Sequence, residues 1–245
     1  MGLVDFNLIY NSLSFAIATF GASSVFFFAQ RSQVAPAYKT ALTLSGLVCL
    51  IAFYHHLRMF ENFNDAFTLA NGEVIATGSY FNVAYRYAGW LLTVPLLLLE
   101  LVLVMRLSKE ETYSTGVKLV FASMLMVILG YLGEGSVALS QLGDRWIYWT
   151  LAMIPFLYIV YSLVKGLNSS ILKQPKTVQK MVSNSRWLLI ISWTFYPVIY
   201  LFPMINQEAS YINIQVGYTI ADVLSISIFG VMIYMTAQRK SDVGA

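Results

Sequence analysis

The sequence predicts an all-α membrane protein, a seven-transmembrane helix bundle, and two observations carry this prediction. Of its 245 residues, 58% are hydrophobic and 11% are charged, whereas soluble domains average roughly 45–50% and 25%. Seven apolar stretches are long enough for a bilayer-spanning helix, which takes about 20 residues. Because the connectors between them leave no room for a soluble domain, we expect residues 1–245 to form a single domain.

Each predicted span is a stretch of about 20 mainly apolar residues. The first begins too close to Met1, and lacks the basic segment that precedes a cleaved signal, so we expect it to be a retained helix. The connector 72–78 is bounded by glycines and rich in β-branched residues, which predicts a short hairpin. In chain order, the seven spans are 6–30, 37–59, 84–105, 116–139, 146–164, 187–205 and 211–235.

The composition also excludes several other classes of protein. So much apolar surface excludes intrinsic disorder, and the single cysteine, Cys49, excludes a disulfide scaffold. A net charge of +3 without a basic cluster excludes a nucleic-acid partner. Metal-ligand spacing, a phosphate-binding loop and a nucleophile–base pair are not found in the sequence, so we expect neither a metal nor an enzyme.

The positions of Lys and Arg predict the orientation in the membrane. Of the 15 basic residues, three (Arg58, Arg86 and Arg145) lie toward one side. The others lie on the opposite side, which the excess of positive charge marks as cytoplasmic. Seven spans then place the N-terminus outside and the C-terminus in the cytoplasm of a multi-pass cell-membrane protein. The cytoplasmic set is Arg31, Lys39, Arg106, Lys109, Lys118, Lys165, Lys173, Lys176, Lys180, Arg186, Arg239 and Lys240.

Ionisable residues within the spans are candidates for function because charge is costly at bilayer depth. Arg86 and Glu100 are 14 residues apart in one span, so they face one direction about 21 Å apart and suit a path across the membrane. Glu100 and Asp222 could instead form only structural bonds between helices. The remaining candidates are Glu134 and the adjacent His55 and His56, of which at most one points into any one site.

Three strings of residues carry a resemblance to a known family. They are Arg86-Tyr-Ala-Gly-Trp-Leu-Leu-Thr-Val-Pro-Leu96 followed by Glu100, Trp193-Thr-Phe-Tyr-Pro197, and Tyr218-Thr-Ile-Ala-Asp222. Together they resemble the microbial rhodopsins, seven-helix proteins that bind retinal. The resemblance covers all seven spans, gives a single rhodopsin-like domain, and is closest to the proteorhodopsin and xanthorhodopsin branch of light-driven proton pumps.

The resemblance implies a retinal pocket built largely from aromatic residues. Flat aromatic faces can hold a flat apolar chain, although aromatics at helical spacing can also simply fill a core. Trp149 matches a glycine that opens a window for an antenna carotenoid in the xanthorhodopsin branch, so we expect no carotenoid. The implied pocket residues are Trp90, Thr93, Met126, Gly130, Trp149, Trp193, Tyr196, Pro197 and Ile226.

The resemblance also implies roles along a proton path. Glu100 matches the cytoplasmic proton donor, for which burial is useful because it disfavours the charged form of a carboxyl group. Arg86 matches the arginine on the extracellular side of the chromophore, and Asp222 matches a carboxylate of the counter-ion complex. His55 matches the histidine that bonds the primary carboxylate of the third span.

The sequence departs from the family at two positions of the reactive centre. The family's retinal-binding lysine lies four residues after the aspartate of span seven, where this chain has Ile226. Isoleucine has no nucleophilic nitrogen, so retinal cannot form a Schiff base there. The primary counter-ion and proton acceptor is an aspartate one residue before Trp90, where this chain has Gly89.

The two departures balance in charge. The reactive centre of a pump holds two positive groups, the Schiff base and an arginine, and two aspartates, so its net charge is zero. In this chain Arg86 and Asp222 remain, and their net charge is also zero. Losing one group alone would leave an uncompensated charge at low dielectric. We therefore hypothesise that the two positions changed together, so that the net charge of the reactive centre stayed at zero.

Three functions stay open from the sequence. The favoured one is a non-pumping rhodopsin-like protein that binds retinal or a similar apolar molecule non-covalently, or that acts as a partner in rhodopsin oligomers. The alternatives are a light-driven proton pump or photoreceptor of the proteorhodopsin type, and a light-independent proton pathway. We expect the lipid bilayer as a partner, and oligomers of this chain alone or with other rhodopsins.

Overall fold

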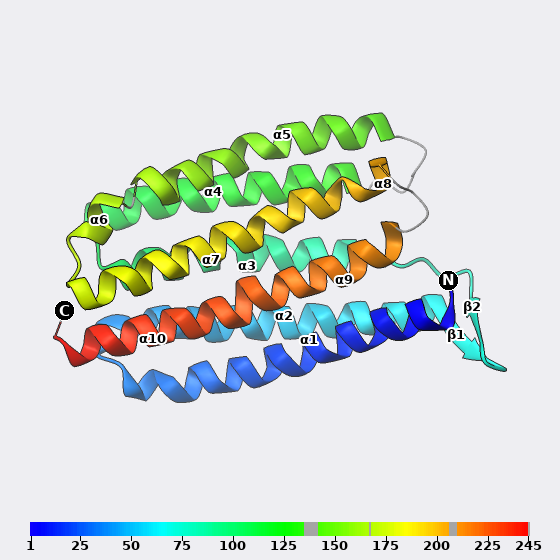
Figure 1. The fold of residues 1–245 in the computed structure, drawn as a ribbon, viewed down its shortest axis with the longest axis horizontal. Coiled ribbons are helices and arrows are strands. Elements are labelled where there is room, and N and C mark those ends of the chain that lie inside the picture. Colours follow the sequence, from blue (N-terminus) through cyan, green and yellow to red (C-terminus); the bar gives the residue numbers. More distant parts are fainter. Residues whose placement is uncertain (135–141, 167, 206–209, 245) are drawn as a thin grey trace.

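The computed structural model describes residues 1–134, 142–166, 168–205 and 210–244. Within these ranges, seven helices are long and apolar enough to cross a membrane, which confirms the predicted bundle. They run alongside one another, and the two chain ends lie at opposite ends of the bundle (Figure 1). The crossings are Leu3–Gln33, Pro36–Ala66, Ala84–Met105, Lys109–Glu134, Gly143–Lys165, Lys176–Ile205 and Tyr211–Asp242.

The crossings differ in how regular their helices are. The first four contain one α-helix each, whereas the fifth and seventh include a π-helical segment. The first four α-helices are α1 (Leu3–Gln30), α2 (Lys39–Ala66), α3 (Ala84–Met105) and α4 (Lys109–Glu134), with 3-10 turns at Arg31–Gln33 and Pro36–Tyr38 between α1 and α2. The fifth crossing is α5 (Leu142–Tyr161) with the π-helix Ser162–Gly166, and α6 (Asn168–Leu172) follows it. The sixth is α7 (Lys176–Tyr200) with α8 (Phe202–Ile205), and the seventh is α9 (Ser210–Asp222), the π-helix Val223–Ile228 and α10 (Phe229–Asp242).

Several helices extend beyond the apolar stretches from which they were predicted. The sixth crossing begins at Lys176 rather than at residue 187, and the seventh ends at Asp242 rather than at residue 235. Backbone hydrogen bonding continues past the bilayer into polar surroundings, so hydropathy underestimates the length of a helix. Residues 135–139, the predicted end of span four, lie outside the described residues.

A hairpin follows α2, as expected for this connector, but it begins earlier in the chain. Strands β1 (Phe67–Ala70) and β2 (Glu73–Ala76) pair antiparallel, with Phe67 opposite Ala76. The two turn residues, Asn71 and Gly72, have φ of 53° and 80°. An Asn-Gly pair with both φ values positive favours the tight turn whose twist matches the strands.

The outer surface of the bundle is apolar, in agreement with a membrane location. Large side chains such as Phe15, Phe121 and Ile154 are 63%, 70% and 65% exposed. Such a surface would be unfavourable in water but suits lipid hydrocarbon. The polar side chains discussed below lie buried inside.

Lys240 fixes the seventh crossing to the third at the end of the bundle that holds the C-terminus. Its ammonium donates to the carbonyl oxygens of Val104 at 3.1 Å and Met105 at 3.4 Å, at the end of α3. The last carbonyls of a helix have no partner within the helix, so a lysine satisfies them well.

Candidate functional site

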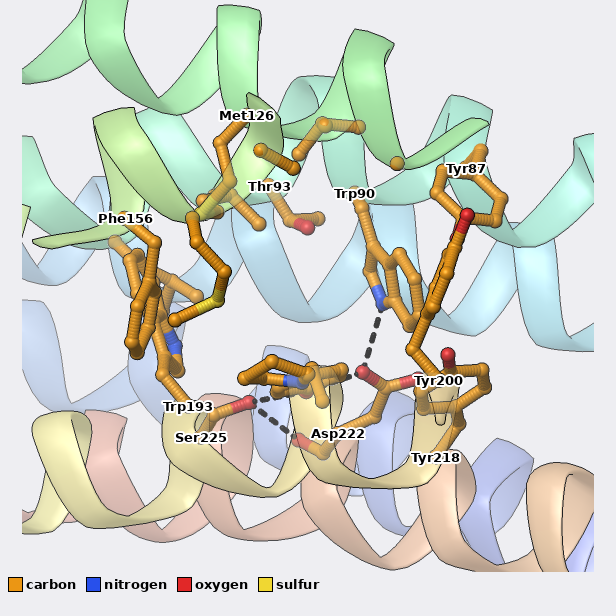
Figure 2. Close-up of a pocket in the computed structure, with 18 of the residues that line it drawn as sticks. Tyr87, Trp90, Thr93, Met126, Phe156, Trp193, Tyr200, Tyr218, Asp222 and Ser225 are labelled. Atoms are coloured by element: carbon orange, nitrogen blue, oxygen red, sulfur yellow. Dashed lines mark hydrogen bonds between the residues drawn. The ribbon is translucent and has the colours of Figure 1, made fainter. Parts of the chain in front are cut away.

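A cavity lies inside the bundle, between α3, α4, α5, α7 and the seventh crossing (Figure 2). The space in it that the centre of a water-sized molecule can occupy is about 100 Å³. All nine pocket residues that the sequence suggested line it, together with eleven others. The lining residues are Tyr87, Trp90, Thr93, Val94, Leu97, Met126, Val127, Gly130, Trp149, Ala152, Met153, Phe156, Trp193, Tyr196, Pro197, Tyr200, Tyr218, Asp222, Ser225 and Ile226.

Three aromatic rings form one wall of this cavity. The indole of Trp90 meets the rings of Tyr196 and Tyr218 edge to face, with both centroid distances 5.0 Å. The two tyrosine rings are stacked, with centroids 5.8 Å apart. Edge-to-face and offset-stacked rings are the favourable arrangements of aromatic pairs, so this wall is rigid. In Figure 2, Phe156 and Trp193 lie on the opposite side of the cavity.

Trp149 lines the cavity from α5 and contacts α7. Pro197 lies in the last turn of α7, and the N–H of Leu201, which follows the helix, bonds the carbonyl oxygen of Val198 instead of that of Pro197, four residues back. The indole N–H of Trp149 donates to the carbonyl oxygen of Pro197 at 3.0 Å. A backbone carbonyl left by the irregular end of a helix is thereby satisfied across the helix interface.

Asp222 is the polar centre of the cavity and is fully buried. Its Oδ1 accepts hydrogen bonds from Trp90 Nε1 at 2.8 Å and from the Tyr196 hydroxyl at 2.6 Å. The Tyr196 hydroxyl also lies 2.9 Å from the Ser225 hydroxyl. Asp222 therefore links α3, α7 and the seventh crossing.

His56, and not His55, is the histidine beside Asp222. Its Nε2 lies 3.3 Å from Asp222 Oδ2, an ion pair whenever the imidazole is protonated. Its Nδ1 donates to the carbonyl oxygen of Ala52 at 2.9 Å, which fixes the ring orientation. The sequence offers no signal that separates the two histidines, because Ala52 and Met59 lie three or four residues from both.

Arg86 is buried near this centre but forms no salt bridge with the carboxylates of the described residues. Its guanidinium lies 5.2 Å from the centre of the Tyr218 ring, a cation–π contact. The direct pairing of Arg86 with Asp222, which charge balance alone would suggest, is absent from the described structure. The oxygens of Asp222 face Trp90, Tyr196 and His56 instead.

A second, smaller cavity adjoins the first, and Gly89 is among its lining residues. A Cβ atom on Gly89 would lie 3.2 Å from both Cβ and Cγ of His55, so His55 faces the place of the missing side chain. Within the described chain, His55 Nδ1 has no hydrogen-bond partner. Its lining residues are Ala52, His55, His56, Met59, Arg86, Gly89, Trp90, Thr93, Asp222 and Ile226.

Ile226 lines both cavities and is 3% exposed. It belongs to the π-helix Val223–Ile228, a rare geometry that often occurs at functional sites. No lysine is among the described residues that line either cavity. The structure thus brings an apolar side chain to the wall that the two cavities share.

Glu100 lies apart from both cavities. It is fully buried, and its Oε2 accepts a hydrogen bond from the Ser45 hydroxyl at 2.8 Å. Its Oε1 has no partner among the residues that the structure describes. The structure therefore separates Glu100 from the other members of the expected proton path.

Glu134, a candidate from the sequence, forms a second carboxylate cluster whose tyrosine partners were not predicted. Glu134 Oε2 accepts hydrogen bonds from the hydroxyls of Tyr87 at 2.5 Å and Tyr218 at 3.2 Å. Tyr218 precedes Asp222 by four residues, so it lies on the same helix face, and this spacing was the available signal. In the described part of the chain, His, Cys, Asp and Glu form no group of three or more that could hold a metal ion.

These features define a seven-helix membrane protein with an apolar internal cavity beside a buried aspartate. The chain belongs to the bacteriorhodopsin-like family, the microbial rhodopsins, because the model of "Bacteriorhodopsin-like protein" matches residues 7–239. It is accordingly an integral protein of the cell membrane.

Particular relatives lie in the branch that the sequence motifs suggested. The green-light absorbing proteorhodopsin of Gamma-proteobacterium EBAC31A08 is 32% identical over 236 residues, which are 95% of this chain and 88% of that protein. The crystallographic structure of xanthorhodopsin, described as a light-driven ion pump with dual chromophore, is 43% identical with a TM-score of 0.94 and covers 100% of this chain and 97% of its own. The structure of thermophilic rhodopsin is 41% identical with a TM-score of 0.94, and covers 100% of this chain and 98% of its own.

Proposed function

We propose that this protein is a non-pumping rhodopsin that binds retinal or a similar apolar molecule without a covalent bond. The observation that carries the proposal is Ile226, an alkyl side chain lining the cavity at the family's lysine position. An alkyl group cannot attack an aldehyde. The ligand must therefore be held by packing and hydrogen bonds alone.

The cavity fits a polyene but not its covalent linkage. Trp90, Trp193 and Tyr196 offer flat faces, and the cavity lining is almost entirely apolar. Met126, Gly130 and Pro197 complete the surfaces that would hold the chain. A bound retinal would supply light absorption.

Gly89 supports the proposal that the protein does not pump. Glycine offers no group that could take up a proton next to the chromophore, and the side chain that faces this place is His55. Glu100, the expected donor, lies outside both cavities.

A light-driven proton pump of the proteorhodopsin type is the second candidate, and the relatives favour it. Xanthorhodopsin, 43% identical, is a light-driven ion pump by its description. Glu100 is also kept at the position of the proton donor. For this chain to pump, retinal would have to bind as a pre-formed imine of a small amine, with an acceptor other than residue 89.

A light-independent proton pathway along Arg86, Asp222 and Glu100 is less well supported. Asp222 and Arg86 line the smaller cavity, but Glu100 lines neither. Among the described residues, the cavities therefore support a proton pathway near Arg86 and Asp222 but not as far as Glu100.

The membrane context of the proposal comes from the charge pattern and the apolar surface. The excess of Lys and Arg on one side supports an external N-terminus and a cytoplasmic C-terminus. We also propose oligomers, either of this chain alone or with other rhodopsins, in which the family's common shape would allow similar packing.

A spectrum tests the proposal. The protein is expressed with all-trans-retinal, purified, and its visible spectrum recorded before and after borohydride or acid. Non-covalent binding gives a band close to that of the free aldehyde, and the retinal is removed by organic extraction. A red-shifted band that persists as a covalent adduct would contradict the proposal and favour the pump. Colourless protein with proton flux in liposomes in the dark would favour the light-independent pathway.

A further inference from the structure

We infer that His56 and Asp222 together form a proton-binding site inside the bundle. In the empty state of this site, His56 is neutral and carries its own proton on Nδ1. One further proton, taken from water, binds between His56 Nε2 and Asp222 Oδ2. The inference does not rest on the proposed function, because it concerns the protein without a ligand and a histidine to which the family resemblance assigns no role.

The position of the first proton follows from the partner of His56 Nδ1. This nitrogen lies 2.9 Å from the carbonyl oxygen of Ala52, one helical turn earlier. A carbonyl oxygen only accepts hydrogen bonds, so Nδ1 must carry the hydrogen. A neutral imidazole has a single N–H, and His56 Nε2 is therefore left with a lone pair.

That lone pair faces an oxygen of Asp222. His56 Nε2 lies 3.3 Å from Asp222 Oδ2, and both atoms are buried without a hydrogen-bond partner among the described residues. Two acceptors at this distance repel each other, and each unpaired buried group is costly. A proton between them gives both atoms a partner in a charge-assisted hydrogen bond, which needs only a small approach to about 2.8 Å.

The other contacts of the pair keep the bound proton on the imidazole. Trp90 Nε1 and the Tyr196 hydroxyl both donate to Asp222 Oδ1, and such donors favour the ionised form of a carboxyl group. From α1, the ring of Phe20 lies 4.8 Å from the imidazole, centroid to centroid, and brings no charge. The loaded site is therefore an imidazolium beside a carboxylate.

Arg86 makes the binding of this proton reversible. It lines the same small cavity as His56 and Asp222, is 3% exposed, and forms no salt bridge within the described residues. In the empty state the charges of Arg86 and Asp222 cancel, whereas the bound proton adds one net positive charge. A net charge is unfavourable at low dielectric, so the site loses its proton as the pH rises.

His55, the other histidine of this cavity, lacks the features that would hold a second proton. It faces the place of the missing side chain at Gly89, and its Nδ1 has no partner in the described chain. None of the described carboxylates forms an ion pair with it. We therefore expect the proton on His56 and not on its neighbour.

NMR of the histidines tests the inference, because the chain contains two of them. The full-length protein, labelled with nitrogen-15 in histidine and purified without retinal, is followed in detergent micelles from pH 5 to 9. We expect a neutral His56 with its proton on Nδ1 at the alkaline end, and the imidazolium as the pH falls. The nitrogen shifts of a neutral ring show which nitrogen carries the proton, so the tautomer is measured directly.

Two histidine variants assign the signals and the proton. His56→Gln should abolish this change, together with the uptake of one proton per molecule in a potentiometric titration. His55→Gln is the matched control, since it removes the adjacent imidazole of the same cavity. It should leave the signal of His56 and its pH dependence in place.

Two charge variants test what sets the proton affinity of His56. Asp222→Asn removes the anion, and the affinity should fall at least about tenfold, because a close opposite charge favours the protonated imidazole by one to three powers of ten. Arg86→Gln removes the competing cation, and the affinity should rise, so that more His56 is protonated at the same pH. Arg86→Gln alone still tests the inference if Asp222→Asn does not fold.

Three results would overturn the inference. They are a neutral His56 with its proton on Nε2, a His56 that stays neutral down to pH 5, and a proton affinity that Arg86→Gln leaves unchanged. None of them bears on the proposed function, because the experiment contains no retinal. Conversely, a protein that binds no retinal can still show the expected titration of His56.

Discussion

Asp222 and Glu100 are both fully buried carboxyl groups, yet their surroundings differ. Asp222 accepts hydrogen bonds from Trp90 and Tyr196, and its Oδ2 lies 3.3 Å from His56 Nε2, so its contacts reach three other crossings. Glu100, in contrast, accepts a hydrogen bond from a single serine. Asp222 therefore links four crossings of the bundle, and this role does not depend on a chromophore. If residue 226 holds the place of the family's lysine, as we propose, Asp222 keeps a role between helices without a Schiff base.

The largest change is expected when the two departures from the family are reversed together. The variant Gly89→Asp with Ile226→Lys, grown with retinal, should give a coloured pigment that titrates with pH. The lysine would lie one helical turn after Asp222, and the new aspartate would lie against His55, which must shift by a few tenths of an ångström. The measurement is the visible spectrum between pH 4 and 10.

The single variants are the controls for this prediction. Each strands one charge at low dielectric, so each should melt at a lower temperature in detergent than the double variant. If the single changes are as stable as the double change, the hypothesis that the two positions changed together is wrong. If the double variant stays colourless, the cavity does not accept retinal.

Replacing Asp222, the carboxyl group with more partners, should have the next largest effect, a loss of stability. Asp222→Leu leaves the indole N–H of Trp90 without an acceptor and removes the contact with His56. We expect a loss of about 3 kcal/mol in the free energy of unfolding, since each buried unsatisfied group costs roughly 1–3 kcal/mol. Denaturation by SDS in mixed micelles measures it, and an unchanged midpoint would contradict the linking role.

Removing one donor to Asp222 should have a smaller effect. Tyr196→Phe deletes a 2.6 Å hydrogen bond but leaves Trp90 on the same oxygen. The expected loss is about 1 kcal/mol in the same assay. Tyr161→Phe is the control, because Tyr161 is 64% exposed on the lipid-facing surface. If the two variants lose the same free energy of unfolding, the hydrogen bond from Tyr196 to Asp222 does not stabilise the fold.

The smallest change is expected at Glu100. Glu100→Met exchanges a carboxyl group with one unpartnered oxygen for an apolar chain of similar length. Ser45 keeps an acceptor, the carbonyl oxygen of Ala41 at 3.3 Å. The free energy of unfolding should stay within about 0.5 kcal/mol or rise. A loss as large as that of Asp222→Leu would show that the two carboxyl groups support the fold equally.

The sequence predicts the bundle well because bilayer thickness dictates the length of each apolar stretch. The nine expected cavity residues were implied by the resemblance to the microbial rhodopsins, and all nine line the cavity. The sequence does not distinguish His55 from His56, because adjacent residues differ only in direction, and direction depends on how α2 packs. The bond from Tyr87 to Glu134 joins residues 47 apart in the chain, and such contacts follow from tertiary packing.

The bond from Trp149 to Pro197 has a consequence for how quickly a ligand can be exchanged. Separating α5 from α7 would leave the Pro197 carbonyl without a partner in hydrocarbon, at a cost of several kcal/mol. Such separations are therefore rare events. A molecule held in the cavity would have a long residence time by this route, even though nothing ties it covalently to the protein.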